Sequence, residues 1–340
     1  MSKIGVLGAG TWGMALARML CNSGHNVCVW SALREEVETF SVTRRHPNLP
    51  GMEIPEEIVF TGEIASVCRG KDILLFAVPS PFVRSTARLA APFVSDNQII
   101  VDVAKGIEAD TLLTMTQIIA QEIGNPSVKL VALSGPTHAE EVARDLPTTI
   151  VSAWEDETVA ELVQNVFWNT CMRVYTNNDV LGVELCGAIK NVIALASGVA
   201  AGLGYGDNTK AALITRGMAE ISRLGMAMGC KEQTFGGLAG IGDLIVTATS
   251  VHSRNNRCGM LIGQGVPVSE AIQQVGMVVE GINALPAAMA LAKKYQVEMP
   301  IVEAAYSVVY EGISPKTVVQ QLMTRGKKPE LPQSAFNNPI

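Results

Sequence analysis

The 340-residue chain contains few charged and few aromatic side chains, which make up 17% and 5% of it. Only 26 lysines and arginines are present and the net charge is −6, which argues against broad electrostatic binding to nucleic acid. Hydrophobic residues make up 48%, which argues against intrinsic disorder. The composition therefore indicates a folded protein of one large or two smaller domains with an extensive buried core.

Long uninterrupted hydrophobic runs are also missing. The best candidate, residues 191–206, is shorter than the roughly 20 apolar residues that a membrane-spanning helix needs, and glycines interrupt it. Residues 4–17, which follow Lys3, have some features of a secretory signal, but three glycines interrupt them as well. We therefore expect neither a signal peptide nor a transmembrane segment.

The seven cysteines form no CxxC pair, and the four histidines show no HxxxH spacing. Without a secretory signal, free thiols are typical of the reducing cytoplasm, where we expect this protein to reside. The scattered histidines argue against a metal site.

Short β-branched runs alternate with helical patterns through the first half of the chain. Strands are expected at residues 4–7, 27–30, 73–78, 99–103, 130–134, 149–153 and 172–176. Helices are expected between them at 12–23, 33–44, 80–93, 108–122 and 155–167. Apolar strands that alternate with helices predict a parallel sheet covered on both faces, a doubly wound α/β domain over residues 1–180.

The pattern changes in the second half, where Ala, Gly, Met and Leu recur at helical spacing. Helices are expected at 183–203, 207–228, 239–249, 254–263, 280–294 and 298–311, with no convincing strand after Thr176. We expect an all-helical domain over residues 181–326. The polar residues 327–340 carry three prolines and are expected to form a loose tail.

A glycine-rich turn stands at the first strand-to-helix junction. Gly8, Gly10 and Gly13 form a GxGxxG pattern directly after the expected strand at 4–7. In this context the glycines allow a tight turn, a close approach to a pyrophosphate and close packing of helix on strand. The helix N-terminus then offers free N–H groups to the anion. The pattern predicts a Rossmann-type dinucleotide site; the alternative is an ordinary glycine turn.

The end of the second strand bears on the choice of cofactor. NAD sites usually carry Asp or Glu there to bind the ribose 2′-hydroxyl. Here the strand ends at Ser31, no carboxylate follows until Glu35, and Arg34 lies close by. This arrangement favours NADP(H), with Arg34 near a 2′-phosphate; the alternative is that Arg34 is a solvated helix residue.

Candidate catalytic residues follow the other strands, because Rossmann-type sites lie beyond the carboxyl ends of their strands. Residues 79–81, Lys105 with Gly106, and the loop 135–139 are placed there. The alternative for Lys105 is a surface lysine in a loop. His138 in the last loop could be a catalytic acid or a structural histidine.

In the helical half, isolated charges stand out against an apolar background. Lys190 lies in an apolar helix, where burial is costly unless the ammonium finds a partner or reaches solvent. Asp243 is similarly isolated and could cap a helix. Ser253, Arg254 and Asn255 open another helix, and an arginine with polar donors at a helix start forms a natural anion clamp.

Over residues 3–325 the chain resembles the bacterial NAD(P)-dependent glycerol-3-phosphate dehydrogenases. The matching segments are GAGTWG, VDVAKGIE, LSGPTHAEEVA, GAIKNVIALASGVAAGLGYGDNTKAALITRGMAEI, GLAGIGDLIVT and SRNNRCG. The resemblance implies a Rossmann domain followed by the helical domain of the 6-phosphogluconate-dehydrogenase-like enzymes. It also implies reversible hydride transfer between NAD(P)H and dihydroxyacetone phosphate, which gives sn-glycerol 3-phosphate for phospholipid synthesis, and a homodimer.

The resemblance further implies roles for individual residues, with Lys190 as the proton-transfer lysine and Asp243 as the carboxylate beside the substrate. The implied substrate positions are Lys105, Gly135, Thr137, Lys190, Asp243, Ser253, Arg254 and Asn255. The implied cofactor positions, with the three glycines, Ser31 and Arg34, are Thr11, Trp12, Lys105, Ala139, Arg254, Val278 and Glu280. The chain departs from the family in the loop that begins at Gly135, which often reads GPSFA in the family. Thr137 keeps the hydroxyl of the serine, whereas His138 replaces an aromatic residue.

A mechanism follows from these residue types. Lys190 would protonate the carbonyl oxygen during reduction and take the proton back during oxidation. A lysine normally titrates near ~10.4, and burial beside Lys105 would lower its pKa while Asp243 opposes that shift. Arg254 and the amides around Asn255 would bind the phosphate far from the reacting carbon.

Two other readings of the sequence stay open. A related two-domain dehydrogenase acting on a hydroxyacid or on ketopantoate would need a carboxylate site rather than a phosphate clamp. A non-catalytic dinucleotide sensor would use the fold without chemistry; it leaves Lys105, Lys190 and Asp243 without a joint purpose.

Overall fold

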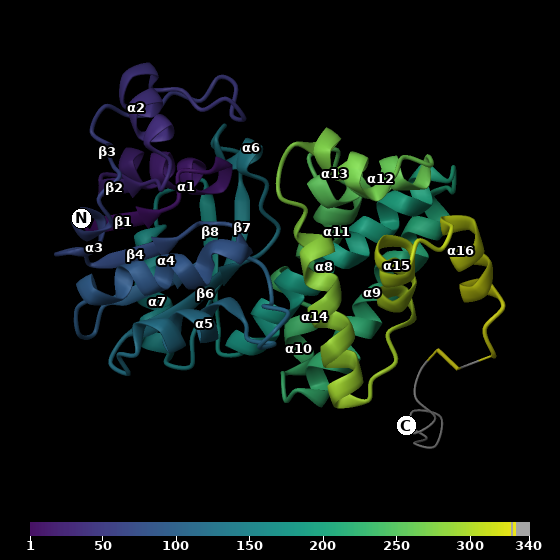
Figure 1. The fold of residues 1–340 in the computed structure, drawn as a ribbon. Coiled ribbons are helices and arrows are strands. Elements are labelled where there is room, and N and C mark those ends of the chain that lie inside the picture. Colours follow the sequence, from purple (N-terminus) through teal and green to yellow (C-terminus); the bar gives the residue numbers. More distant parts are fainter. Residues whose placement is uncertain (328, 331–340) are drawn as a thin grey trace.

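The computed structural model describes residues 1–327, 329 and 330. It contains a β-sheet with surrounding helices, built by the first half of the chain, beside a bundle of helices built by the second half (Figure 1). This confirms the expected fold class. Most of the predicted tail, residues 328 and 331–340, lies outside the described residues.

The sheet has eight strands in the order β3-β2-β1-β4-β5-β6-β7-β8. Their bounds are β1 (Lys3–Leu7), β2 (Asn26–Trp30), β3 (Val59–Thr61), β4 (Ile73–Phe76), β5 (Ile99–Asp102), β6 (Lys129–Ser134), β7 (Thr148–Ala153) and β8 (Met172–Asn177). All neighbours are parallel except β6 and β7, which are antiparallel. The expectation of a parallel sheet is therefore wrong at this one junction, because the short connection through 135–147 returns the chain alongside β6 instead of crossing over.

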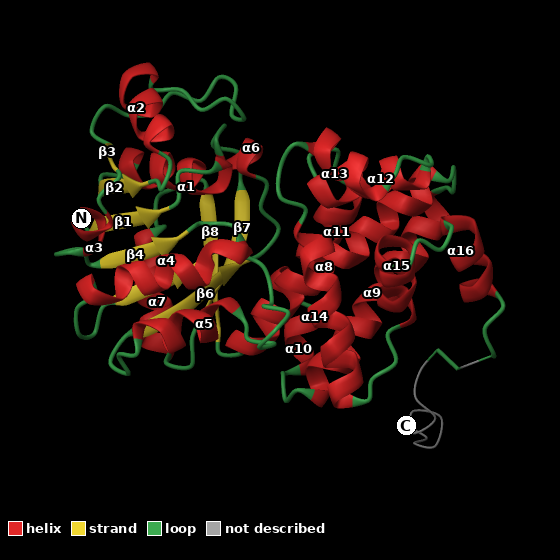
Figure 2. Ribbon diagram, in the orientation of Figure 1, coloured by secondary structure: helices red, strands yellow, loops and turns green. Residues whose placement is uncertain are grey.

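Helices cover both faces of this sheet (Figure 2). Apolar side chains of α1 (Thr11–Asn22), α2 (Arg34–Thr43), α6 (Ala139–Val142) and α7 (Glu157–Val166) fill one face. Those of α3 (Ile64–Cys68), α4 (Val83–Ala90) and α5 (Met115–Ile123) fill the other. Successive β-strand residues therefore supply both cores, as the doubly wound prediction requires.

In this half one helix start was predicted wrongly and two short elements were missed. The helix expected from residue 108 begins only at Met115, because Thr114 and Gln117 form a capping box there and Leu112 has a φ of 60°. The edge strand β3 and the short helix α3 were not predicted. Both are too short, at three and five residues, to show a hydrophobic period.

Among the described residues, no strand follows Asn177. The helices there are α8 (Val180–Gly202), α9 (Asp207–Ala227), α10 (Glu232–Phe235), α11 (Asp243–Thr249), α12 (Arg254–Gly263), α13 (Val268–Val275), α14 (Glu280–Tyr295), α15 (Pro300–Tyr310) and α16 (Pro315–Met323). The sequence missed α10, α13 and α16. The helix expected over 239–249 is broken, because Gly240 leaves helical geometry within a π-type turn that precedes α11.

Helix α8 forms the centre of the second half. Among the described residues it is the one single helix long and apolar enough to cross a membrane, but most of it is buried inside the fold. Two of its glycines allow α12 to pack against its backbone. A Cβ atom at Gly198 would lie 2.1 Å from the Asn256 carbonyl oxygen, and one at Gly202 would lie 2.2 Å from that of Met260. The glycines that interrupt the apolar run thus serve helix packing.

Candidate active site

The turn between β1 and α1 has the shape of an anion cradle. Gly8 has a φ of 120°, and a Cβ atom there would lie 2.8 Å from the Ala77 carbonyl oxygen. A Cβ atom at Gly13 would lie 2.2 Å from the Gly8 carbonyl oxygen, whereas one at Gly10 would meet nothing within 4 Å. The first and third glycines therefore serve the tight turn and the packing, and the second leaves open space beside the α1 N-terminus.

The first residues of α1 also fit a bound dinucleotide. The Thr11 hydroxyl oxygen is buried and has no hydrogen-bond partner among the described residues. Trp12 is half-buried and packs against the core on this face of the sheet. An unpartnered hydroxyl and free helix N–H groups around an open cradle match what a pyrophosphate requires. The residues present therefore fit a dinucleotide cofactor.

A buried charge cluster lies where the helical bundle meets the carboxyl ends of the strands. Lys190, on α8, donates from Nζ to Oδ1 of Asp243 at 2.5 Å and to Oγ1 of Thr247 at 2.6 Å. Lys105, after β5, donates from Nζ to the other Asp243 oxygen at 2.7 Å. Lys190 is 4% exposed and Asp243 0%. The structure thus brings together three residues that are far apart in the sequence.

The prediction that Asp243 caps a helix was wrong. Gly242 occupies the cap position of α11, and the Asp243 carboxylate binds the two lysines instead. Burial lowers the pKa of Lys190 to about 7; the Asp243 carboxylate opposes this shift and the Lys105 ammonium adds to it. A lysine poised near neutrality and held in place by a carboxylate can both give and accept a proton.

The loop after β6 joins this cluster. The Gly135 carbonyl oxygen accepts hydrogen bonds from Lys105 Nζ at 3.0 Å and from the Thr137 hydroxyl at 3.1 Å. Ala139 is buried at the start of α6. The main chain of the loop therefore positions Lys105, and the predicted residues Gly135 and Thr137 lie beside the lysine cluster.

The start of α12 has the features of the predicted anion clamp. The Ser253 hydroxyl caps the helix by accepting from the Asn256 N–H at 3.2 Å. The side chain of Arg254 is half-buried and makes no hydrogen bond with the described residues. Burial lowers its pKa, whereas Glu280 and Glu140 oppose that shift. The guanidinium is therefore available to an anion.

Asn255 differs from the expectation in one respect. Its side chain is engaged within the protein, because it donates to Oδ1 of Asn191 at 2.9 Å and accepts from the Gly281 N–H at 2.8 Å. The amide side chain thus ties α12 to α8 and α14. Backbone N–H groups of the α12 N-terminus remain for an anion.

Besides Arg254, the predicted cofactor residues in the helical half are Val278 and Glu280, which lie just before and at the start of α14. Oε1 and Oε2 of Glu280 accept hydrogen bonds from the Ser80 N–H at 3.1 Å and the Ser80 hydroxyl at 2.5 Å. Ser80 follows β4, so this contact joins the two halves of the chain. Val278 is half-buried two residues earlier.

His138 lies at the seam between the sheet and the helical bundle. Its ring centroid is 5.8 Å from that of His252, and its Nε2 atom is buried without a partner among the described residues. Burial and the charge of Lys190 lower the pKa of His138. The imidazole is therefore held neutral near Lys190. A direct catalytic role for it stays a prediction.

Sequence reasoning missed Thr247 and Glu184. Thr247 carried a weak signal, since it stands four residues after Asp243 and so shares its face of α11. The Glu184 carboxylate is buried on α8 and accepts from the Thr114 hydroxyl at 2.7 Å, the Thr116 hydroxyl at 2.6 Å and the Thr116 N–H at 2.8 Å. It therefore fastens α8, six residues before Lys190, to the N-terminus of α5.

Replacing Glu184 by glutamine is expected to lower the free energy of unfolding by about 1–3 kcal/mol, because an amide cannot accept all three donors. Thermal unfolding of the purified protein measures this loss. Glu161→Gln, the same change on the exposed face of α7, serves as control and should leave the unfolding temperature unchanged. Equal unfolding temperatures for the two variants would contradict a fastening role.

Among the described residues, no group of three or more His, Cys, Asp or Glu side chains is placed to hold a metal ion. All seven cysteines are free.

Comparisons with known proteins show the family of this chain. Residues 3–160 match the family model described as NAD-dependent glycerol-3-phosphate dehydrogenase N-terminus, and residues 179–320 match the C-terminus model of the same family. A glycerol-3-phosphate dehydrogenase (NAD(P)+) of Lactobacillus delbrueckii subsp. bulgaricus is 68% identical, over 97% of this chain and 99% of that protein.

Solved structures point the same way. The glycerol-3-phosphate dehydrogenase of Coxiella burnetii has a TM-score of 0.91 at 35% identity, over 95% of this chain and 99% of that one. A ketopantoate reductase from Ralstonia eutropha has a TM-score of 0.60 at 15% identity, over 94% of this chain and 99% of that one, so it shares the fold alone. With both halves matched and relatives this similar, the chain belongs to the NAD-dependent glycerol-3-phosphate dehydrogenase family.

Proposed function

We propose that this chain interconverts dihydroxyacetone phosphate and sn-glycerol 3-phosphate with a nicotinamide dinucleotide, and so supplies glycerol 3-phosphate for phospholipid synthesis. The observation that carries the proposal is the buried contact of Lys190 and Lys105 with one carboxylate, Asp243, at the carboxyl edge of the sheet. This edge also holds the glycine turn and, across the seam, the α12 N-terminus. When bound, the nicotinamide supplies or accepts the hydride.

Lys190 is the proposed proton donor and acceptor. An ammonium has three donor positions, and Asp243 and Thr247 occupy two of those on Lys190. The third is left for a substrate oxygen. During reduction the proton moves from Nζ to the carbonyl oxygen, and during oxidation the neutral amine takes it back from the hydroxyl.

Asp243 and Lys105 set the properties of this lysine. The carboxylate fixes Nζ in position, and the second ammonium helps to keep the pKa near neutrality. Lys105 Nζ also has one donor position beyond Asp243 and Gly135. We propose that it contacts the substrate from the side of the sheet.

The phosphate of the substrate is the proposed ligand of Arg254 and the α12 N-terminus. Replacing Arg254 by alanine should raise the KM for dihydroxyacetone phosphate about 10- to 100-fold, because a charge-assisted contact is lost. Initial rates at saturating dinucleotide measure this. An increase confined to the KM of the dinucleotide would assign Arg254 to the cofactor instead.

Substrate comparison tests the function as a whole. Initial rates are measured with dihydroxyacetone phosphate, ketopantoate and simple 2-keto acids, each with NADH and with NADPH. We expect turnover of the phosphorylated ketone alone. Faster turnover of a keto acid would favour the related two-domain dehydrogenases, and tight dinucleotide binding without turnover of any carbonyl compound would favour a sensor.

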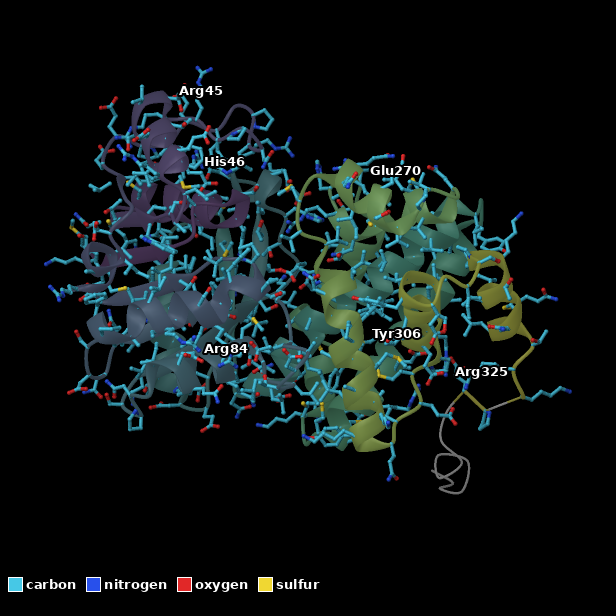
Figure 3. The ribbon with its side chains drawn as sticks, in the orientation of Figure 1. Arg45, His46, Arg84, Glu270, Tyr306 and Arg325 are labelled. Atoms are coloured by element: carbon cyan, nitrogen blue, oxygen red, sulfur yellow. The ribbon has the colours of Figure 1, made fainter. Side chains whose placement is uncertain are left out.

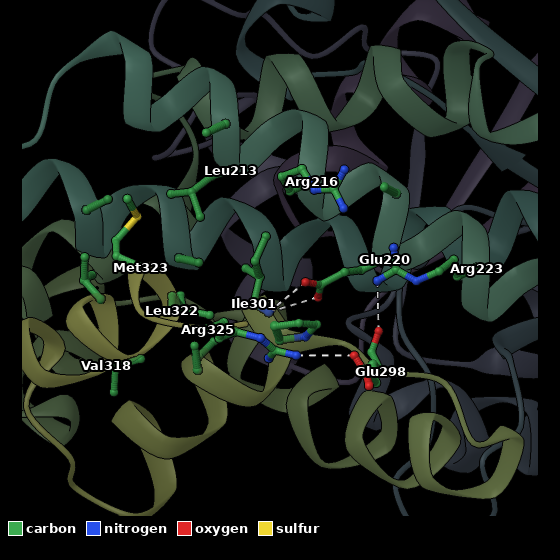
Figure 4. Close-up of a pocket in the computed structure, with 18 of the residues that line it drawn as sticks. Leu213, Arg216, Glu220, Arg223, Glu298, Ile301, Val318, Leu322, Met323 and Arg325 are labelled. Atoms are coloured by element: carbon green, nitrogen blue, oxygen red, sulfur yellow. Dashed lines mark hydrogen bonds and ion pairs between the residues drawn. The ribbon is translucent and has the colours of Figure 1, made fainter. Parts of the chain in front are cut away.

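We further propose a homodimer located in the cytoplasm. A groove of about 1130 Å³ is bordered by α8, α9, α15 and α16, and its lining includes none of Lys105, Lys190 and Asp243. Figure 4 shows several of the residues that line it. Its lining is largely apolar and includes Met226 and Met323, which are 51% and 80% exposed. Exposed apolar patches of this kind mark contact surfaces. A mass twice that of one chain in solution would support the dimer, and the free thiols support a reducing compartment.

The choice between the two dinucleotides is the finer part of this proposal. The sequence favours NADP(H) through Arg34. In the structure Arg34 is exposed and its guanidinium is bonded to Glu38 at 2.7 Å, so it would have to leave that partner to meet a 2′-phosphate.

A further inference from the structure

The carboxyl end of β2 lies directly beside the glycine turn. The Gly8 N–H donates to the Trp30 carbonyl oxygen at 3.0 Å, and Ser31, the next residue, is 5% exposed. In Rossmann-type domains the adenosine ribose of a dinucleotide binds at this strand end. A dinucleotide bound in this way would bring its ribose 2′-position close to Ser31.

A carboxylate that the sequence pattern did not reveal is held at this point. The Ser31 hydroxyl accepts from the Leu33 N–H at 3.1 Å and donates to Oε2 of Glu36 at 2.5 Å. Glu36 lies in the first turn of α2, five residues beyond Ser31, and is half-buried. Its Oε1 atom accepts no hydrogen bond from the part of the chain that the structure describes. One carboxylate oxygen is thus fixed and the other is open to a donor.

A buried histidine, His46, lies between the glycine turn and the region of Glu36. Its imidazole hydrogen-bonds to the carbonyl of Ala9, the residue between Gly8 and Gly10, and the charge of Glu36 acts on it through space. Burial lowers the pKa of His46, although Glu36 and Ala9 oppose the shift. Nδ1 accepts from the Asn48 N–H at 3.2 Å, so the neutral ring has its proton on Nε2. His46 therefore adds no positive charge at this position.

The nearby arginines are directed elsewhere. Arg34 is 91% exposed at its side chain and bonded to Glu38. Arg44 donates to the carbonyl oxygens of Pro55 and Ile58. Arg45 is exposed, and Figure 3 shows it at the outer edge of the molecule, whereas His46 lies nearer the sheet. The group held at the end of β2 is thus an anion.

We propose that Glu36 makes this enzyme prefer NADH over NADPH, by accepting a hydrogen bond from the ribose 2′-hydroxyl. A carboxylate is a good acceptor for a hydroxyl donor, whereas it repels a 2′-phosphate dianion. The proposal rests on the dinucleotide part of the proposed function and reverses the preference expected from Arg34. Glu36 stands in the first turn of α2 and its side chain returns to Ser31, so the acid is absent from the sequence of the strand end itself.

Dinucleotide binding to the purified full-length chain tests the proposal without any substrate. The Kd values of NADH and NADPH are measured by fluorescence titration, together with those of 5′-AMP and 2′,5′-ADP. We expect NADH to bind at least tenfold more tightly than NADPH, and 5′-AMP more tightly than 2′,5′-ADP. Glu36→Gln keeps the shape but removes the charge, and should reduce the NADH preference about tenfold.

Glu38→Gln is the matched control, since it is the same change two residues later on an exposed side chain. It should leave the NADH Kd unchanged. If Glu38→Gln lowers the NADPH Kd to the value for NADH, then Arg34, released from Glu38, decides the cofactor preference and the proposal fails. The proposal also fails if NADPH binds as tightly as NADH to the unaltered chain, or if Glu36→Gln leaves the ratio of the two Kd values unchanged.

A second variant guards against misfolding of Glu36→Gln. Ser31→Ala removes the hydroxyl that holds the carboxylate and should also reduce the NADH preference, while the thermal unfolding temperature reports folding. Dinucleotide binding tests the role of Glu36, and turnover of dihydroxyacetone phosphate tests the proposed function, so the two can fail separately. NADH preference without reduction of dihydroxyacetone phosphate would overturn the function alone, and reduction with NADPH preferred would overturn the role of Glu36 alone.

Discussion

Replacing Lys190 by methionine is expected to lower kcat for reduction of dihydroxyacetone phosphate by about 10²- to 10⁴-fold, the usual contribution of a positioned acid. Methionine nearly conserves the volume of the side chain but has no proton to give. Steady-state kinetics at saturating ketone and dinucleotide measure the loss. The Kd of the dinucleotide should stay near its original value, because the glycine turn is unaltered.

The control for this variant is Lys293→Met, the same change at an exposed residue of α14. It should retain full turnover. If Lys190→Met also retained normal turnover, Lys190 would have no part in the proton transfer. If it lost dinucleotide binding as well as turnover, the residue would hold the fold or the cofactor site rather than the proton.

Replacing Asp243 by asparagine is expected to have the second largest effect. The carboxylate is fully buried and is the common partner of two ammonium groups, and breaking a buried ion pair from one side typically costs about 3–5 kcal/mol. Because Asp243 is the group that opposes the lowering of the Lys190 pKa, its loss should lower that pKa further. The pH above which reduction declines should therefore move downward, and kcat at pH 7 should fall about 10²-fold or more.

Thermal unfolding and the pH profile of kcat measure these two consequences separately. Asp207→Asn, at the exposed N-terminus of α9, is the control and should change neither. A pH profile that stays in place in Asp243→Asn would contradict the coupling between Asp243 and Lys190, even if stability were lost.

The lowered pKa of Lys190 also predicts a pH dependence of stability. An unfolded lysine keeps its proton up to about pH 10.4, whereas the folded one loses it near pH 7. Between these values the unfolded chain binds more protons, so this group makes folding more favourable as the pH rises through that window.

The fold was predictable where the sequence carried strong periodicity. Strands such as β4 are continuously apolar, and GxGxxG follows β1, so the sheet, its first βα turn and the helical second half were all expected. Edge strand β3 and the antiparallel turn into β7 depend on sheet pairing that no local pattern encodes. Short helices such as α13 give too few turns for a clear hydrophobic stripe.

The candidate site shows the same division. Lys190 and Asp243 stood out because charge is scarce around them, but their contact with each other depends on the packing of α8 against α11. For the same reason Asp243 was taken for a helix cap. Tertiary packing also decides between Arg34 and Glu36 at the end of β2, since both lie in the first turn of α2 and only one points back to Ser31.

The pH dependence of kcat/KM in both directions tests the central role of Lys190 most directly. Reduction needs the ammonium and oxidation needs the neutral amine, so reduction should fall above about pH 7 and oxidation should fall below it. Because reduction takes up a proton, the ratio of kcat/KM for reduction to kcat/KM for oxidation must change with pH in any mechanism. The pH at which each profile bends is not fixed in this way and depends on the group that transfers the proton. We expect both profiles to bend at the same pH near neutrality, and the bends to disappear in Lys190→Met. Bends that persist in that variant would contradict this account.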